Sequence, residues 1–538
     1  MADANAETGY ELLECKGHRM MRGRLLMALA ASAVCQSKMG VARDVAPESQ
    51  ALVVADQASG LASSAAPVQT LQQALARTYE TNPILLAQRA ELRRLDSGVA
   101  LQRAAGRPQI AANADYNQEI SVTRKLGTRG RSLSVSTNVQ QVLFASGRIR
   151  NSVRAAETRV IAGRADLRAT EADVLTEAVS VYADLLRDRE VQVYALGQIR
   201  ALATNLDSAR ARFRVGDLTR TDVSQSEARL ALARSNLATA EGRLQSSEEN
   251  FQRVVGARAG VLEPLPPLPP MPLTAEQAVE SALVDNPDVA SIVAQARAAG
   301  YDVSATKAER LPTISAVGFA SYDDALGTAD RAAGVPKGTV LDRVTTVEAG
   351  FSIRLPLYQG GAASARVRQA EETRAQVWER AIAAERLTVA NARAAFATWR
   401  SALIAITANE AAASANEMAL QSIKVEQTVG SRSILDVLNA EQELLQSRID
   451  LADARRDAYV AAFTLLNAMG AAEAADLNLE TGPQYDPRAN YKEYAGTWSD
   501  WADGPRRAAT STRTVPEQVD SPVTRLKTGT PNKFEKRP

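Results

Sequence analysis

The residues that most often carry catalysis or bind metal ions are almost absent from this chain. Its 538 residues include one histidine, His18, and two cysteines, Cys15 and Cys35. All three lie near a predicted export signal, and cleavage after Ala33 would leave one cysteine and no histidine. That composition excludes structural zinc, disulfide frameworks and catalysis by cysteine or histidine. Serine, aspartate and glutamate remain, but they form no active-site or nucleotide-binding motif. We therefore predict a protein that is not an enzyme and that holds no cofactor or metal ion.

The export signal is predicted from three adjoining stretches. A basic stretch ends at Arg24, an apolar run starts at Leu25, and small residues up to Ala33 fit a cleavage site. The apolar run is too short to cross a bilayer as a helix. We predict that residues 1–33 are an N-terminal extension and signal peptide, and that residues 34–66, which are small and polar, form a flexible leader.

Cys35 raises the separate question of lipid attachment. A lipid-attachment cysteine normally follows a glycine, alanine or serine, whereas Val34 precedes Cys35 here. The sequence therefore favours a protein without a lipid anchor.

Length and charge limit the class of protein. A chain of 538 residues can hold two or three ordinary domains, and 4% aromatic residues together with abundant alanine and leucine suit long helices. The formal net charge is +1, so no general basic field points to a nucleic-acid partner.

One stretch of the chain occurs twice, and a seven-residue repeat follows each copy. The copies begin at Val215-Gly216 and at Val429-Gly430. The repeating positions are Val223, Leu230, Leu237, Leu244 and Phe251 in the first copy, and Val437, Leu444, Leu451, Ala458 and Leu465 in the second. Seven-residue spacing is typical of a left-handed coiled coil, and glycine is the usual residue where a helix stops. Each copy therefore predicts a long helical hairpin with its tip at the glycine.

The spacing of apolar residues changes after Pro108 and again after Pro312. Before each proline it is that of a helix, and after it every second residue is apolar. Four segments of about ten residues then alternate between apolar and polar side chains, as transmembrane β-strands do. A soluble sheet with one wet face is the alternative. Four strands cannot close a barrel, and open sheet edges are not tolerated in lipid. We therefore expect three chains to share a twelve-stranded barrel in contact with outer-membrane lipid, which makes the protein a homotrimer.

Each strand pair is followed by a long predicted helix, from about Gly147 to Phe213 and from about Gly361 to Gln427. At 1.5 Å per residue, each helix is about 100 Å long. The predicted fold class is therefore an internally duplicated α+β membrane protein, in which a shared β-barrel continues into a coiled-coil tunnel. The predicted regions are a first repeat at 67–262, a proline-rich linker at 263–272, a second repeat at 273–475 and a polar, partly disordered C-terminal tail at 476–538.

This duplicated order of elements resembles the TolC family of outer-membrane channel-tunnels. The resemblance covers Leu71 to Gly470 and is most specific at Asn82-Pro83, Asn286-Pro287, Leu357–Gly361 and Val429–Leu438. It implies a trimeric barrel in the outer membrane of a Gram-negative bacterium, with a helical tunnel projecting into the periplasm. It also implies that a periplasmic adaptor (membrane fusion) protein and an inner-membrane pump, either ABC-type or proton-driven, are its partners.

The resemblance further implies a closed-state latch. In the family, an arginine after the second tip holds a Thr-Asp pair after the first tip, and those positions here are Arg432, Thr221 and Asp222. The family's latch also includes a tyrosine, and Gln427 occupies that position here. A solvated ion pair at a helix end is the alternative for Arg432 and Asp222.

The family also carries two acidic residues that ring the periplasmic aperture. They correspond here to Asp436 and Asn439, so we expect a weaker preference for cations than a fully acidic ring would give. A charge that favours the N-terminus of a helix is the alternative for Asp436. The turns at Val215, Gly216, Val429 and Gly430 are then the expected docking sites for the adaptor.

The resemblance thus implies a passive exit duct for an export machine of three parts, used in type I protein secretion, multidrug efflux or both. The alternative is a periplasmic coiled-coil scaffold or adaptor protein without a membrane barrel.

Overall fold

The computed structural model describes residues 68–118, 131–328, 341–477, 479, 484–505 and 508–511. The predicted signal peptide and leader, with His18, Cys15 and Cys35, lie outside the described residues, as does the end of the C-terminal tail. The elements in chain order are α1 (Leu71–Thr81), α2 (Pro83–Ala104), β1 (Gln109–Gln118), β2 (Arg131–Phe144), α3 (Arg148–Arg214), α4 (Arg220–Val255), α5 (Ala275–Asp285), α6 (Pro287–Ala308), β3 (Thr313–Asp324), β4 (Arg343–Arg354), α7 (Ala362–Thr428), α8 (Ile434–Met469) and α9 (Ala489–Tyr494).

The two halves of the chain contain helices of equal length. Helices α1 and α5 have 11 residues each, α2 and α6 have 22, α3 and α7 have 67, and α4 and α8 have 36. The expected bounds of the long helices and the positions of both tips are confirmed to within about one residue. Within the described ranges, no helix is both long and apolar enough to cross a membrane.

The repeated Asn-Pro pair has the same structural role in both halves. Asn82 caps α2 by accepting the backbone N–H groups of Ile84 and Leu85, and its side-chain amide donates to the carbonyl of Val254 at 3.2 Å. Asn286 caps α6 in the same way and donates to the carbonyl of Ala468 at 3.1 Å. Proline fits the first helical position because its missing N–H has no intrahelical partner there. Each asparagine therefore joins the start of one helix to the end of the hairpin that follows.

The four strands form one antiparallel sheet in the order β1-β2-β3-β4. Its register places apolar and polar side chains on opposite faces. One row across the sheet is Ile110, Val139, Gly318 and Ala349, and a row on the other face is Asn113, Ser136, Ser321 and Thr346. Strands β1 and β4 are the two edges. The expectation of four strands with one apolar and one polar face is confirmed.

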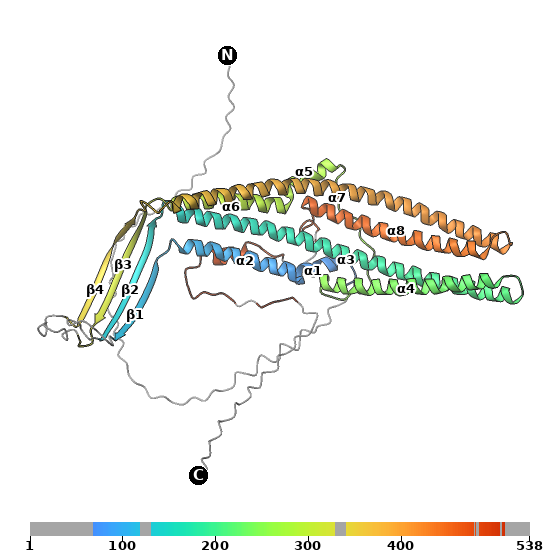
Figure 1. Ribbon diagram of the computed structural model, residues 1–538, viewed down its shortest axis with the longest axis horizontal. Coiled ribbons are helices and arrows are strands. Elements are labelled where there is room, and N and C mark those ends of the chain that lie inside the picture. Colours follow the sequence, from blue (N-terminus) through green and yellow to red (C-terminus); the bar gives the residue numbers. More distant parts are fainter. Residues whose placement is uncertain are drawn as a thin grey trace, which may run out of the picture. The chain divides into compact units, whose positions relative to one another are not determined.

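The long helices continue directly from the sheet. Helix α3 follows β2 and α7 follows β4, so the sheet lies at one end of these helices and the α3–α4 and α7–α8 turns lie at the other (Figure 1). The main apolar core lies where α1, α2 and the end of α4 pack on α3, around Tyr182 and Phe251, which are fully buried. The Tyr182 hydroxyl lies 2.8 Å from the carbonyl of Glu263, and Leu265 and Leu268 of the proline-rich linker pack against this core.

The described part of the C-terminal region packs on α1 and α2, and the expectation of a polar, partly disordered tail remains a prediction for the rest. The Arg89 guanidinium lies 5.1 Å from the ring centre of Tyr485 and 4.4 Å from that of Tyr79. Helix α9 then packs on α2, where the Asn490 amide donates to Asp96 at 2.9 Å. The sequence did not reveal this packing because the segment is short and has no hydrophobic period. Aromatic–arginine contacts replace a buried apolar face.

Candidate functional site

Both hairpin tips are built from the same pair of backbone motifs. Gly216 and Gly430 have φ of +85° and +80°, a region that glycine enters without steric cost. The N–H of Gly216 donates to the carbonyl of Phe213, and the next N–H, that of Asp217, donates to Arg212, which terminates the long helix. Gly430 repeats this pattern, and Val215 and Val429 beside the glycines are 80% and 76% exposed. Each tip therefore presents an exposed valine on a rigid turn.

The helices that leave the tips begin with matching capping boxes. Asp222 accepts the N–H of Thr219 at 2.9 Å, and Asp436 accepts the N–H of Ser433 at 3.0 Å. The N–H of each aspartate donates back to the hydroxyl of its partner. Hydrogen bonds from Thr219 and Ser433 lower the pKa values of Asp222 and Asp436 below the usual range of aspartate. Both carboxylates therefore remain ionised at neutral pH.

The predicted latch is not closed within one chain. Arg432 Nε lies 2.8 Å from Glu426 Oε2, and this ion pair raises the pKa of Arg432. Within the described part of a single chain, Arg432 thus pairs with the helix before its own tip rather than with Thr221 or Asp222. Gln427 contributes its backbone carbonyl to the turn by accepting the N–H of Gly430 at 3.2 Å. The latch remains a prediction.

A contact between the two hairpins lies next to the predicted aperture residues. Asn439 Oδ1 accepts a hydrogen bond from Arg229 Nη2 of α4 at 2.8 Å, and Arg229 also donates to Gln442. Arg229 therefore places a positive charge beside the predicted aperture ring. Sequence reasoning missed it because nothing in the sequence fixes which face of α4 meets α8.

A second contact between the hairpins is more deeply buried. Glu441 of α8 is only 3% exposed. Its Oε2 accepts a hydrogen bond from Asn205 Nδ2 of α3 at 2.9 Å, and its Oε1 lies 3.0 Å from Lys424 Nζ of α7. Next to it, Leu438 is 1% exposed and packs against Leu202, Leu206 and Leu230. We call the set Asn205, Arg229, Leu438, Asn439, Glu441 and Gln442 the inter-hairpin clasp; Lys424 is not part of it, because α7 and α8 belong to the same hairpin.

A third contact joins α3 to α8 nearer the middle of the helices. Arg187 Nη1 lies 2.9 Å from Asp453 Oδ1, and Arg456 Nε lies 2.8 Å from Asp184 Oδ1. Each pair is only partly exposed, so it is screened less than a surface pair. These pairs and the clasp hold the two hairpins together along α8.

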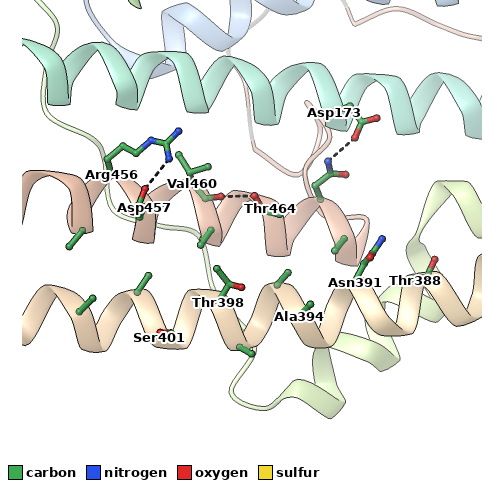
Figure 2. A pocket seen from close by; sticks show the side chains of 18 of the residues that line it. Asp173, Thr388, Asn391, Ala394, Thr398, Ser401, Arg456, Asp457, Val460 and Thr464 are labelled. Atoms are coloured by element: carbon green, nitrogen blue, oxygen red, sulfur yellow. Dashed lines mark hydrogen bonds and ion pairs between the residues drawn. The ribbon is translucent and has the colours of Figure 1, made fainter. Parts of the chain in front are cut away.

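An open groove of about 1390 Å³ lies between the middle of α7 and the C-terminal half of α8. Figure 2 shows Asn391 and Thr398 of α7 pointing toward α8, with Asp173 of α3 on the far side. The groove is lined mainly by alanine and by small polar residues. Burial, and then the neighbouring Asp173, raises the pKa of Asp288 at its edge. Over the part of the chain that the structure describes, no cluster of histidine, cysteine, aspartate or glutamate could hold a metal ion.

A two-faced antiparallel sheet joined to long coiled-coil hairpins is the architecture of an outer-membrane channel. The family described as outer membrane efflux protein matches residues 70–257 and 278–471, and the chain belongs to this family. It is therefore a protein of the outer membrane of a Gram-negative bacterium.

Relatives with known roles cover most of the chain. The chain is 32% identical over 438 residues to outer membrane efflux protein BepC of Brucella suis, which spans 81% of this chain and 93% of the relative. It is 24% identical over 425 residues to outer membrane protein TolC of Escherichia coli, spanning 77% and 85%. It is 26% identical over 397 residues to alkaline protease secretion protein AprF of Pseudomonas aeruginosa, spanning 71% and 80%. By their names, the first of these relatives is an efflux protein and the third is a protease secretion protein.

Solved structures share the fold. The CmeC outer membrane channel of Campylobacter jejuni is 15% identical, with a TM-score of 0.65 over 79% of this chain and 89% of that one. The outer-membrane channel OprN gives a TM-score of 0.64 at 19% identity, over 74% and 89%.

Proposed function

We propose that the protein is the passive exit duct of a three-part export system. The register of the sheet carries this proposal, because it gives the four strands one apolar and one polar face. Such a sheet suits lipid on one side and water on the other. The tips at Gly216 and Gly430 then lie in the periplasm, where an adaptor and an inner-membrane pump dock. The pump supplies the energy.

We infer that three copies of the chain assemble. The free edges of β1 and β4 need partners in lipid, and three copies give a closed barrel of twelve strands. The groove between α7 and α8 would be covered by a neighbouring chain. The equal helix lengths of the two halves support an origin by internal duplication.

The inter-hairpin clasp is proposed to hold the aperture closed in each chain, and the predicted latch at Arg432 would link neighbouring chains. Opening then requires α8 to move away from α3 and α4, so both sets of contacts must break. The cargo is proposed to be a secreted protein, small toxic molecules or both, because the named relatives include secretion and efflux proteins.

Single-channel recording in planar bilayers tests this function. Protein purified in detergent is expected to form small, cation-selective openings, and native mass spectrometry of the same sample is expected to give three chains. Arg432→Ala should enlarge the openings. The matched control is Arg455→Ala, since Arg455 pairs with Glu410 inside one hairpin, at 3.0 Å. Protein that stays soluble without detergent and never conducts would refute the exit duct and favour a scaffold without a barrel.

A further inference from the structure

The C-terminal segment forms a closed loop whose tip carries two tryptophans. Gly504 has φ of +70°, and a Cβ at this position would lie 2.9 Å from the Tyr494 hydroxyl. The glycine therefore packs directly on Tyr494, so the two ends of the loop are in contact. Inside the loop, the N–H of Thr497 donates to the Tyr494 carbonyl at 3.1 Å, and the N–H of Trp501 donates to the Ser499 hydroxyl at 3.3 Å. We call residues 494–504 the tryptophan loop.

Two arginines fix the tryptophan loop to the end of α2. Arg103 Nη1 donates to the carbonyl of Ala495 at 2.9 Å, and Arg107 donates to the carbonyls of Gly496 and Thr497. The Arg107 guanidinium also lies 4.5 Å from the centre of the Trp498 ring. These contacts define where the loop sits, even though most of its surface faces outward.

The tip residues are exposed to an unusual degree. Trp498 is 72% exposed and Trp501 is 93% exposed, although tryptophan is a large, largely apolar side chain that usually buries most of its ring. Two exposed tryptophan side chains on a fixed loop indicate a surface that is covered by a membrane or by another molecule.

The position of the tryptophan loop beside the sheet indicates that a membrane covers it. Arg107 is two residues before β1. The ten residues of β1 extend about 33 Å, and a tilt of about 40° reduces this to about 25 Å, the height of the apolar band of such barrels. The start of β1, next to Arg107, therefore lies at the membrane boundary. At the same end of the sheet, Phe144, Ile353 and Tyr358 are also exposed.

We propose that the tryptophan loop inserts Trp498 and Trp501 into the headgroup region of the periplasmic leaflet, among zwitterionic phospholipids. Tryptophan is enriched at this depth because its ring is apolar and its N–H can still bond to water or headgroups. Asp500 and Asp503 near the tip offset the charges of Arg103 and Arg107. The loop therefore has no excess of positive charge for anionic lipids, and apolar partition rather than charge holds it. This inference rests on the proposed function, because it places the sheet in the membrane.

Tryptophan fluorescence in lipid nanodiscs tests the proposal. The full-length protein is reconstituted in phosphatidylcholine and phosphatidylethanolamine that carry a nitroxide quencher at the headgroup. The Trp498→Phe/Trp501→Phe variant isolates the loop signal by difference. Trp378→Phe is the matched control, since Trp378 is partly exposed on α7 but about 24 Å along the helix from its start. The headgroup quencher should reduce the loop signal at least about twofold, as expected for rings at that depth, and should leave the Trp378 signal unchanged.

Each alternative occupant gives a different result. If acrylamide in the aqueous phase quenches the loop tryptophans and the nitroxide lipid does not, the loop faces water. Protection from both quenchers would mean that a second copy of the chain covers the loop. Quenching that appears only when anionic lipid is added would contradict apolar partition. Each of these results overturns the proposal while channel conductance persists, whereas loss of conductance together with failure to enter nanodiscs would refute the proposed function instead.

Discussion

Removing the hydrogen bond from Asn205 to Glu441 should shift the channel toward its open state. Glu441 is almost fully buried, and Asn205 Nδ2 donates to it at 2.9 Å across the boundary between the hairpins. A hydrogen bond to a charged group contributes about 1.5–3 kcal/mol. Asn205 is only half-buried, so the lower end applies, and this corresponds to about a tenfold larger opening constant per chain.

The assay is the open probability of single channels formed by Asn205→Ala. The matched control is Asn409→Ala, which makes the same substitution on α7. The Asn409 amide donates to the carbonyl of Asp450 at 3.2 Å, and both residues belong to one hairpin. If opening separates the hairpins, the bond from Asn409 to Asp450 stays intact. A contact that is equally strong in the closed and open states does not change the equilibrium between them. Equal open probabilities for the two variants, with both assembled normally, would refute the role of the clasp.

Three further predictions concern the tips. Arg432→Ala should increase conductance only in assembled channels. It should leave the thermal stability of the detergent-solubilised chain nearly unchanged, because an exposed ion pair contributes about 0–1 kcal/mol. A large loss of stability would show that the ion pair with Glu426 is structural. Asp436→Asn should reduce the ratio of potassium to chloride permeability, measured from reversal potentials in a salt gradient, whereas Asn439→Asp should increase it; unchanged ratios would place both residues away from the bore. Because the folded-state pKa values of Asp222 and Asp436 are lowered, their caps stabilise the tips above the ordinary aspartate pKa of about 3.9 and are lost as the pH falls through the folded values. Spin labels at the two turns should therefore become more mobile below about pH 4, while a label in the middle of α7 should not.

The helices and strands could be predicted from the sequence because each has one hydrophobic repeat that continues unchanged through the whole segment. Leu167, Val174 and Leu185 repeat at helical spacing, and all three are buried on α3. The strands could be predicted because the alternation began at Pro108 and Pro312, where helices must stop. Local signals of this kind survive folding because tertiary contacts reinforce them.

The contacts between hairpins could not be predicted in the same way. Asn205 and Glu441 are 236 residues apart, and their meeting depends on the rotation of α3 and α8 about their axes. A change of one residue in phase turns a helix by about 100°, which is enough to separate them. The shape of the tryptophan loop could not be predicted for a different reason. Its fixed shape comes from backbone carbonyls that accept hydrogen bonds from Arg103 and Arg107, and no side-chain pattern records such bonds.

The two aspartates at the tips can serve as helix caps and still act in the aperture. In Asp222 and in Asp436, the hydrogen bonds from the capping partner's N–H and hydroxyl both reach the same oxygen, Oδ2. A carboxylate has a second oxygen with acceptor capacity of its own. Oδ1 of Asp222 can therefore accept Arg432 of a neighbouring chain, and Oδ1 of Asp436 can face a cation in the bore, without loss of either cap. Capping also fixes the rotamers and keeps the groups ionised, so the structural role of these residues is compatible with the roles predicted for them in the latch and the aperture.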